Sequence, residues 1–153
     1  MAGVRKFIFG DLISFVLVIA IILGVASFAL SLSQKTTKTV SSLSFSVGSL
    51  NNDGSYKKSK TSIYTKELFE CEGLTVTLDF EADLEYQVFY YVDKYTYVGR
   101  TGKMSEEYSR GDDCPEAKYA RIVITPELGD SKEEIYSWEA FNYARYLKIT
   151  VNK

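Results

Sequence analysis

The sequence predicts an all-β domain, a two-sheet antiparallel sandwich, that follows a single N-terminal transmembrane helix. The first observation behind this prediction is one long apolar run near the N-terminus. The second is the alternation of apolar and polar residues later in the chain, interrupted by short turns rich in Gly, Asp, Asn and Ser. The predicted organisation is a short cytoplasmic head (1–11), a transmembrane anchor (12–32), a spacer (33–42) and an extracytoplasmic β-sandwich domain (43–153).

The apolar run from Leu12 to Leu30 predicts the membrane anchor. At about 1.5 Å of rise per residue, a helix of this length matches the ~30 Å hydrocarbon core of a bilayer. Arg5 and Lys6 precede the run and Lys35 and Lys38 follow it, so flanking charge alone does not set the orientation. A cleavable signal peptide is the alternative, because small residues lie near the end of the run.

The cysteines favour an exported location for the C-terminal domain. Cys71 and Cys114 are the only two cysteines in the chain. An even pair in an exported domain predicts one disulfide, which would contribute about 3 to 4 kcal/mol by restricting the unfolded chain. Two unpaired thiols are the alternative. With the disulfide, we expect a single-pass membrane protein whose C-terminal domain is extracytoplasmic.

Six segments have the alternation and the Val, Ile, Tyr, Phe and Thr content of half-buried strands. The predicted strands are Leu43–Val47, Thr61–Thr65, Leu74–Phe80, Tyr86–Val92, Tyr119–Thr125 and Leu147–Val151. Lys132 to Tyr146 instead has apolar residues at helix-like spacing. We expect a helical turn or a short irregular strand there, with Trp138 packed against the sandwich.

Three stretches between about Ser42 and Pro126 carry a resemblance to a known family. They are Gly48–Ser55 leading to Thr61–Tyr64, then Tyr86–Asp93 with Tyr97–Gly99, and finally Cys114–Ile124. They resemble the first strand and turn, a central strand and the penultimate strand of the galactose-binding-like β-sandwich. This jelly-roll domain occurs in carbohydrate-binding modules and in surface and phage-tail proteins. The resemblance implies a jelly-roll-like fold and glycan binding, but no ligand motif transfers a sugar-binding residue or the structural calcium of some relatives.

Tyrosine content is the strongest compositional sign of binding. All twelve tyrosines lie in the predicted exported domain, and tyrosine offers a flat apolar face together with a hydroxyl group. In an extended strand, Tyr86, Val88 and Tyr90 share one face, and the opposite face includes Tyr91. The candidate ligand-binding residues are Tyr90, Tyr91, Tyr95 and Tyr97. Ordinary core packing of the same rings is the alternative.

Catalytic and metal-binding signals are weak. The chain has no histidine, which removes the commonest general base and metal ligand. The sequence Asn51–Gly54 is similar to the start of a calcium loop, but Lys60 would occupy the position of the bidentate Glu. The chain has no stripe of basic residues of the kind that binds nucleic acid. The acidic clusters are interpreted as solvated turns and edges rather than sites; they are Asp79, Glu81, Asp83 and Glu85, and Asp112, Asp113 and Glu116.

These observations favour a surface binding protein over an enzyme, with no catalytic residue, no metal and no cofactor expected. We expect a glycan or surface polymer as ligand and the lipid bilayer as a second partner, through residues 12–32. The alternative function is a structural or adhesion module that binds another protein in an envelope assembly. A membrane-tethered hydrolase using a carboxylate pair is a third, weaker hypothesis.

Overall fold

The computed structural model describes residues 37–39, 43–79, 82–128 and 134–152. The predicted head and the predicted transmembrane anchor lie outside these residues. Within them, no helix has the length and apolar character needed to cross a membrane. The strands are β1 (Thr37–Thr39), β2 (Phe45–Val47), β3 (Ser49–Leu50), β4 (Tyr56–Lys57), β5 (Ile63–Thr65), β6 (Phe69–Glu70), β7 (Thr75–Leu78), β8 (Leu84–Tyr91), β9 (Tyr97–Arg100), β10 (Tyr108–Ser109), β11 (Tyr119–Pro126) and β12 (Leu147–Asn152).

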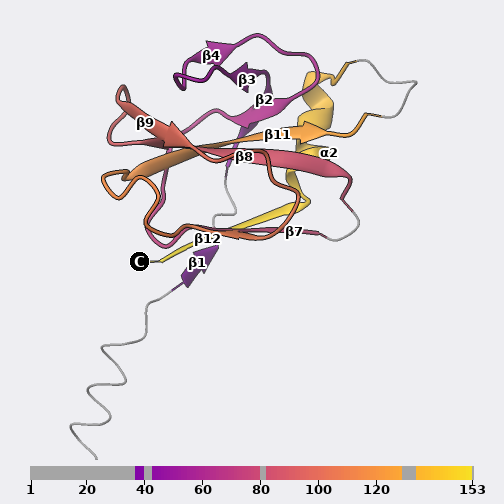
Figure 1. The fold of residues 1–153 in the computed structure, drawn as a ribbon. Coiled ribbons are helices and arrows are strands. Elements are labelled where there is room, and N and C mark those ends of the chain that lie inside the picture. The colour runs from indigo at the N-terminus through magenta and orange to yellow at the C-terminus, as the bar shows by residue number, and fades with distance from the viewer. Residues whose placement is uncertain (1–36, 40–42, 80–81, 129–133, 153) are drawn as a thin grey trace, which may run out of the picture. The chain divides into compact units, whose positions relative to one another are not determined.

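Two antiparallel sheets dominate the described residues, as Figure 1 shows. The first sheet has the strand order β1-β12-β7-β10. The second has the order β2-β5-β11-β8-β9, and β6 also pairs with β11. All pairings in these sheets are antiparallel, which confirms the predicted all-β class.

Strands β8 and β11 form the centre of the second sheet. They pair over eight residues, from Leu84 opposite Pro126 to Tyr91 opposite Tyr119. Their alternation sends Tyr86, Val88 and Tyr90 to the inner face, as the sequence predicts. The register therefore places one continuous apolar row of β8 against the other sheet.

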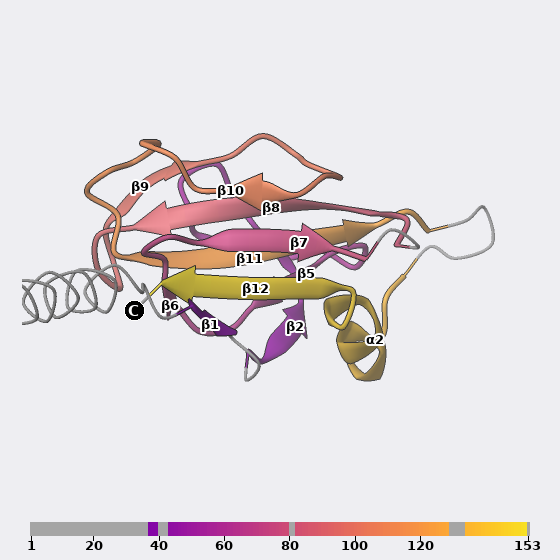
Figure 2. The ribbon, with the colours of Figure 1, turned by 90° about the horizontal axis from the view of Figure 1, so that it is seen from below.

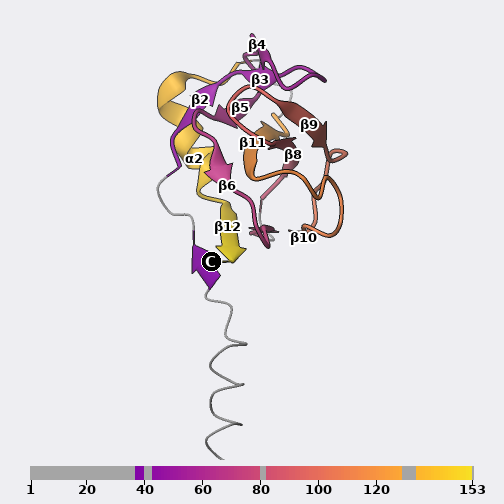
Figure 3. The ribbon, with the colours of Figure 1, turned by 90° about the vertical axis from the view of Figure 1, so that its left-hand side faces the viewer.

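The main core lies between the two sheets. It combines inner-face residues of the second sheet, such as Ile63 and Ile122, with Val76, Ile149 and Val151 of the first. Figure 2 shows the strands of the first sheet passing over those of the second, and Figure 3 shows the two layers from the side. Burial of these β-branched residues removes apolar area from water at about 25 cal/mol per Å², which is the main force holding the sheets together.

A second, smaller cluster lies on the outer face of the second sheet. Phe89, Tyr91 and Val123 are covered there by Leu50 of the β3–β4 hairpin. Gly54 lies in the turn of this hairpin with φ of +75°, and a β-carbon there would lie 2.6 Å from the Tyr97 ring. The hairpin therefore buries a face that alternation alone would leave exposed.

All six predicted strands are present, within a few residues of their predicted ends. The short strands β3, β4, β6, β9 and β10 were not predicted. Strand β1 lies inside the predicted spacer, where Thr37 to Thr39 pair with β12. Two of its three residues are β-branched threonines, which favour extended backbone, and the pairing covers an edge of the first sheet.

The predicted helical turn is present as the short 3₁₀ helix η1 (Ser137–Glu139) followed by α2 (Ala140–Ala144). Glu139 accepts a hydrogen bond from the backbone N–H of Tyr136 at 2.8 Å, which satisfies an otherwise unpaired donor at the start of the segment. The prediction that Trp138 packs against the sandwich is wrong, because its side chain is 73% exposed. Ile135 and Ala140 supply the buried face instead.

Candidate functional site

Tyr90 is a core residue rather than a surface residue. Its side chain is only 1% exposed, and its ring lies in the core between the sheets. Its hydroxyl shares a 2.6 Å hydrogen bond with the hydroxyl of Tyr108. The guanidinium carbon of Arg110 lies 5.3 Å from its ring centroid, within the range of a cation–π contact. Tyr90 thus stabilises the fold at one end of the core.

The other three predicted tyrosines lie outside that core but do not form one exposed surface. Tyr91 is 5% exposed and donates a 2.9 Å hydrogen bond to the Gly54 carbonyl oxygen. Its ring packs edge-on against Tyr97, with 5.8 Å between centroids. Only Tyr95, in the turn after β8, is open to solvent, with an exposed fraction of 93%. The four candidate ligand-binding tyrosines therefore do not share one exposed surface.

Three other exposed aromatic residues lie close together in sequence, at the N-cap of η1, on η1 and on α2. Tyr136, Trp138 and Phe141, which we call the aromatic patch, are 59%, 73% and 76% exposed. The rings of Tyr136 and Trp138 are nearly parallel, with 6.2 Å between centroids and 7° between planes. Trp138 and Phe141 are three residues apart in a helical segment, so they project from the same side. Such exposure of three large aromatic side chains is unusual for a surface without a partner.

The segment that carries the aromatic patch is anchored on both sides. The Ile135 N–H donates a 2.6 Å hydrogen bond to the Lys60 carbonyl oxygen, and Ile135 and Ala140 are buried. An ion pair between Lys60 and Glu134 balances charge beside the patch. The Glu139 carboxylate accepts the Tyr136 N–H. The patch is therefore an exposed aromatic surface, and the described charged residues Lys60, Glu134 and Glu139 beside it have partners.

The aromatic content of this segment could have predicted the aromatic patch, but the helix-like spacing of the rings indicated burial instead. Three aromatic residues fall within the six residues from Tyr136 to Phe141, between the acidic pair Glu133–Glu134 and Arg145. The helix-like spacing suggested a buried stripe. The segment forms only a few helical residues, however, and Ile135 and Ala140 occupy the inner side. The larger rings are left on the outer side.

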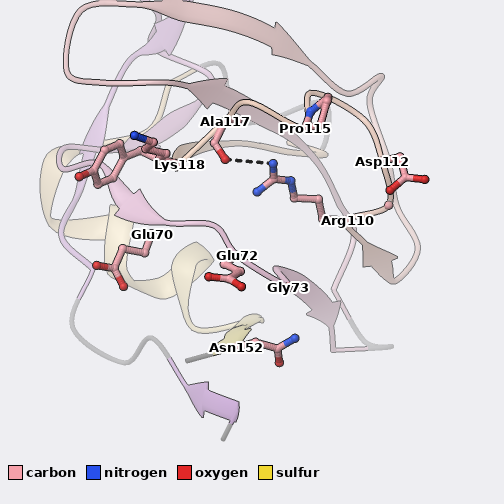
Figure 4. A pocket seen from close by; sticks show the side chains of 11 residues that line it. Glu70, Glu72, Gly73, Arg110, Asp112, Pro115, Ala117, Lys118 and Asn152 are labelled. Carbon is pink, nitrogen blue, oxygen red and sulfur yellow. Dashed lines mark hydrogen bonds between the residues drawn. The ribbon is translucent and has the colours of Figure 1, made fainter. Parts of the chain in front are cut away.

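A polar pocket of about 740 Å³ lies near the C-terminal end of β12. Figure 4 shows Arg110 reaching toward Ala117 on one side, with Glu70, Glu72 and Asn152 across from it. Gly73 has φ of +55°, and a β-carbon there would lie 2.0 Å from the Asn152 amide nitrogen, so this position requires glycine. The lining is mostly charged and amide groups.

Arg110 is a structural residue of this pocket. Its Nη1 donates to the Cys71 carbonyl oxygen at 2.8 Å and to Cys71 Sγ at 2.9 Å. Its Nη2 donates to the carbonyl oxygens of Cys114 and Ala117 at 2.8 and 3.0 Å. Both terminal nitrogens are thus used, and they join the β6–β7 loop to the β10–β11 loop. Arg110 holds the pocket together and has little donor capacity left for a ligand.

The predicted disulfide is absent, and that prediction is wrong for this structure: Cys71 and Cys114 are both free thiols. Cys71 is buried with its sulfur beside Arg110. Cys114 has φ of +53°, and its sulfur packs against Gly99, where an added β-carbon would lie only 2.5 Å away. Burial raises the pKa of both thiols, which lowers their reactivity.

We expect alkylation of the denatured chain without reductant to add two adducts per molecule, because both thiols are free. In the native chain at neutral pH, Cys71 should react much more slowly than in the denatured chain, since its sulfur is buried and its pKa is raised. Intact mass spectrometry, with and without prior reduction, measures the number of adducts on the denatured chain and the progress of labelling on the native chain. Labelling that requires reductant would show that the cysteines are bridged and would contradict this assignment.

Two acidic residues of the segments considered at the sequence level, Glu85 of the acidic clusters and Asp53 of the calcium-loop candidate, have ordinary structural partners. Glu85 forms a 2.6 Å ion pair with Lys103. Asp53 accepts hydrogen bonds from the Ser55 hydroxyl and N–H at 2.6 and 3.0 Å, which lowers the Asp53 pKa. Among the described residues no group of carboxylates, cysteines or histidines has the arrangement of a metal site. Glu81 lies outside the described residues.

The chain was compared with protein-family models, with curated proteins and with solved structures, and none of the three comparisons found a match.

Proposed function

We propose that the protein is a single-pass, membrane-anchored binding protein that recognises a glycan or surface polymer through the aromatic patch. The proposal places the anchor at residues 12–32 and the β-domain outside the cytoplasm. It treats the two packed sheets as a jelly-roll-like sandwich of the galactose-binding-like kind. The apolar run and the strand motifs support these parts.

The observation that carries the proposal is the near-parallel, exposed pair of rings of Tyr136 and Trp138. Flat aromatic faces bury the apolar C–H faces of sugar rings, and the tyrosine hydroxyl adds a hydrogen-bonding group. The partnered charges beside the patch suit an uncharged sugar face better than a charged peptide. Large, rigid aromatic side chains also lose little rotamer entropy on binding.

Trp138→Ala is expected to weaken polymer binding by about 2 kcal/mol or more, roughly thirtyfold in Kd, because exposed aromatic anchors dominate such surfaces. The measurement is co-sedimentation of the detergent-solubilised full chain with cellulose, chitin, xylan and peptidoglycan. Circular dichroism should show an unchanged fold, since the Trp138 side chain is mostly in solvent.

Tyr95→Ala is the matched control, because Tyr95 is an exposed aromatic residue in a different turn. It should bind like the wild type. If Tyr95→Ala lost binding and Trp138→Ala kept it, the ligand surface would lie at the turn after β8. A wild-type chain that binds no polymer in a broad panel would refute the proposed function.

A second candidate, the binding of another protein in an envelope assembly, is favoured by an apolar groove of about 280 Å³ beside the patch. Leu43, Phe45, Phe141, Ala144 and Leu147 contribute most of its apolar lining. Crosslinking in intact membranes followed by mass spectrometry tests this candidate. A stoichiometric protein crosslink that is lost in Ala144→Arg would support it, whereas an unchanged crosslink would place the contact elsewhere.

A further inference from the structure

Another hollow lies on the outer face of the second sheet, and none of its lining residues belongs to the aromatic patch. Its volume is about 530 Å³, within the usual range of small-molecule sites. The segment between β5 and β6, the turn after β8 and the outer side of β11 form its walls. The lining residues are Glu67, Leu68, Asp93, Lys94, Tyr119 and Arg121.

Arg121 is the unusual residue of this pocket. Its guanidinium carbon lies 6.0 Å from the ring centroid of Tyr91, and its Nε is buried with no hydrogen-bond partner. In the described parts of the chain, ion pairs join Lys60 to Glu134 and Lys103 to Glu85, and neither includes Arg121. A half-buried guanidinium without a carboxylate is energetically unfavourable unless a ligand or solvent compensates its charge.

Arg110 provides a comparison in the same domain, because both of its terminal nitrogens donate hydrogen bonds. Its two terminal nitrogens donate to three carbonyl oxygens and one sulfur. No hydrogen bond of this kind engages Arg121 among the described residues. The fold therefore holds Arg121 in a pocket without using its donors, which is the arrangement expected of a ligand-binding arginine.

The acidic residues of the pocket form no ion pair with Arg121. The Asp93 carboxylate accepts hydrogen bonds from Tyr95 N–H at 2.8 Å and from Thr96 N–H and hydroxyl at 3.0 Å. These bonds fix the turn after β8 and lower the Asp93 pKa, so its charge is retained near neutral pH. Glu67 is exposed, and it forms no ion pair with Arg121.

The lining defines the chemistry of the ligand. Arg121 offers a planar fork that matches a carboxylate, and Lys94 adds a second positive charge. Because Glu67 and Asp93 also line the pocket, a singly charged group fits better than a phosphate with two charges. Their carboxylates can accept hydrogen bonds from sugar hydroxyls, and the Tyr119 ring and Leu68 provide apolar surface.

We propose that this pocket binds the carboxylate of an acidic sugar, with Arg121 as the bidentate donor and Lys94 as the supporting cation. The pocket shares no residue with the aromatic patch. The site is therefore separate, and it does not depend on the proposed binding of polymers at Trp138.

The test is calorimetric titration of the full chain with a galacturonic acid oligosaccharide and with its methyl ester, which has the same rings but no charge. The acid should bind at least about tenfold more tightly than the ester, as expected for charge-assisted hydrogen bonds. Arg121→Gln should remove this preference. Arg121→Lys should keep part of it, because lysine retains the charge but lacks the planar fork.

Lys57→Gln is the control for loss of a positive charge, since Lys57 is exposed on β4 and does not line the pocket. It should keep the full preference for the acid. Thermal unfolding of each variant distinguishes loss of binding from loss of fold. Equal binding of acid and ester, binding of neither, or an unchanged preference in a folded Arg121→Gln chain would overturn the proposal.

Discussion

Arg110→Met is expected to lower the free energy of unfolding by about 3 kcal/mol or more. The substitution removes the guanidinium that joins the carbonyl oxygens of Cys71, Cys114 and Ala117. A partly or fully buried acceptor left without a donor costs about 1 to 3 kcal/mol, and three acceptors lose their donor together. Methionine keeps much of the aliphatic stem, so the loss comes mainly from the polar contacts. Urea unfolding followed by circular dichroism measures it.

Arg100→Met is the matched control for this prediction. The Arg100 guanidinium also lies over an aromatic ring, 5.9 Å from the Phe89 centroid, but the residue is exposed on β9. Its substitution should lower the free energy of unfolding by less than about 1 kcal/mol, as is usual for exposed charged residues. Similar losses for the two variants would show that the hydrogen bonds of Arg110 do not hold the loops together.

Stability is expected to fall steeply as the pH rises from about 10 to about 12. Burial raises the pKa of Tyr86 to about 12 and that of Tyr91 to about 12, and it also raises the pKa of Tyr90. An unfolded tyrosine ionises near pH 10, so the unfolded chain loses these protons first. The contribution of the neutral rings is therefore complete below about pH 10 and is lost as the pH passes through the folded-state pKa values.

The measurement is the urea midpoint as a function of pH, with tyrosinate absorbance recorded on the same samples. Tyr91→Phe should reduce the slope above pH 10, because one of the tyrosines with a raised pKa no longer ionises. The same variant loses the hydrogen bond to the Gly54 carbonyl oxygen, so its stability at neutral pH must be measured as well. A urea midpoint that stays constant up to about pH 12 would contradict burial of these rings.

The strands of the fold were predictable because a half-buried strand alternates in sequence. Tyr86, Val88 and Tyr90 follow this rule and enter the main core. The covering of the outer face was not predictable, because the β3–β4 hairpin is formed by residues that are distant in sequence from Phe89 and Tyr91. Alternation is the same whether the outer face of a strand is exposed to solvent or covered by another segment. Tyr91 lies on a covered outer face, under the hairpin.

The candidate sites were harder to predict than the strands. Trp138 was expected in the core, yet the short helical segment buries Ile135 and Ala140 and leaves the indole in solvent. The pairing of Cys71 with Cys114 was inferred from their number alone, whereas the turn at Cys114 directs its sulfur toward Gly99. Arg121 carries no sequence signal, because its lack of a partner depends on contacts among three separate segments.

Tryptophan fluorescence gives the most direct test of glycan binding at the aromatic patch. The chain contains a single tryptophan, so its emission reports on Trp138 alone. Because the indole is 73% exposed, a polymer that stacks on it should shift its emission to shorter wavelength as binding saturates. We expect this shift to follow the same concentration dependence as co-sedimentation. A polymer that binds the wild-type chain at saturation without changing the emission of Trp138 would contradict the assignment of the patch as the binding surface.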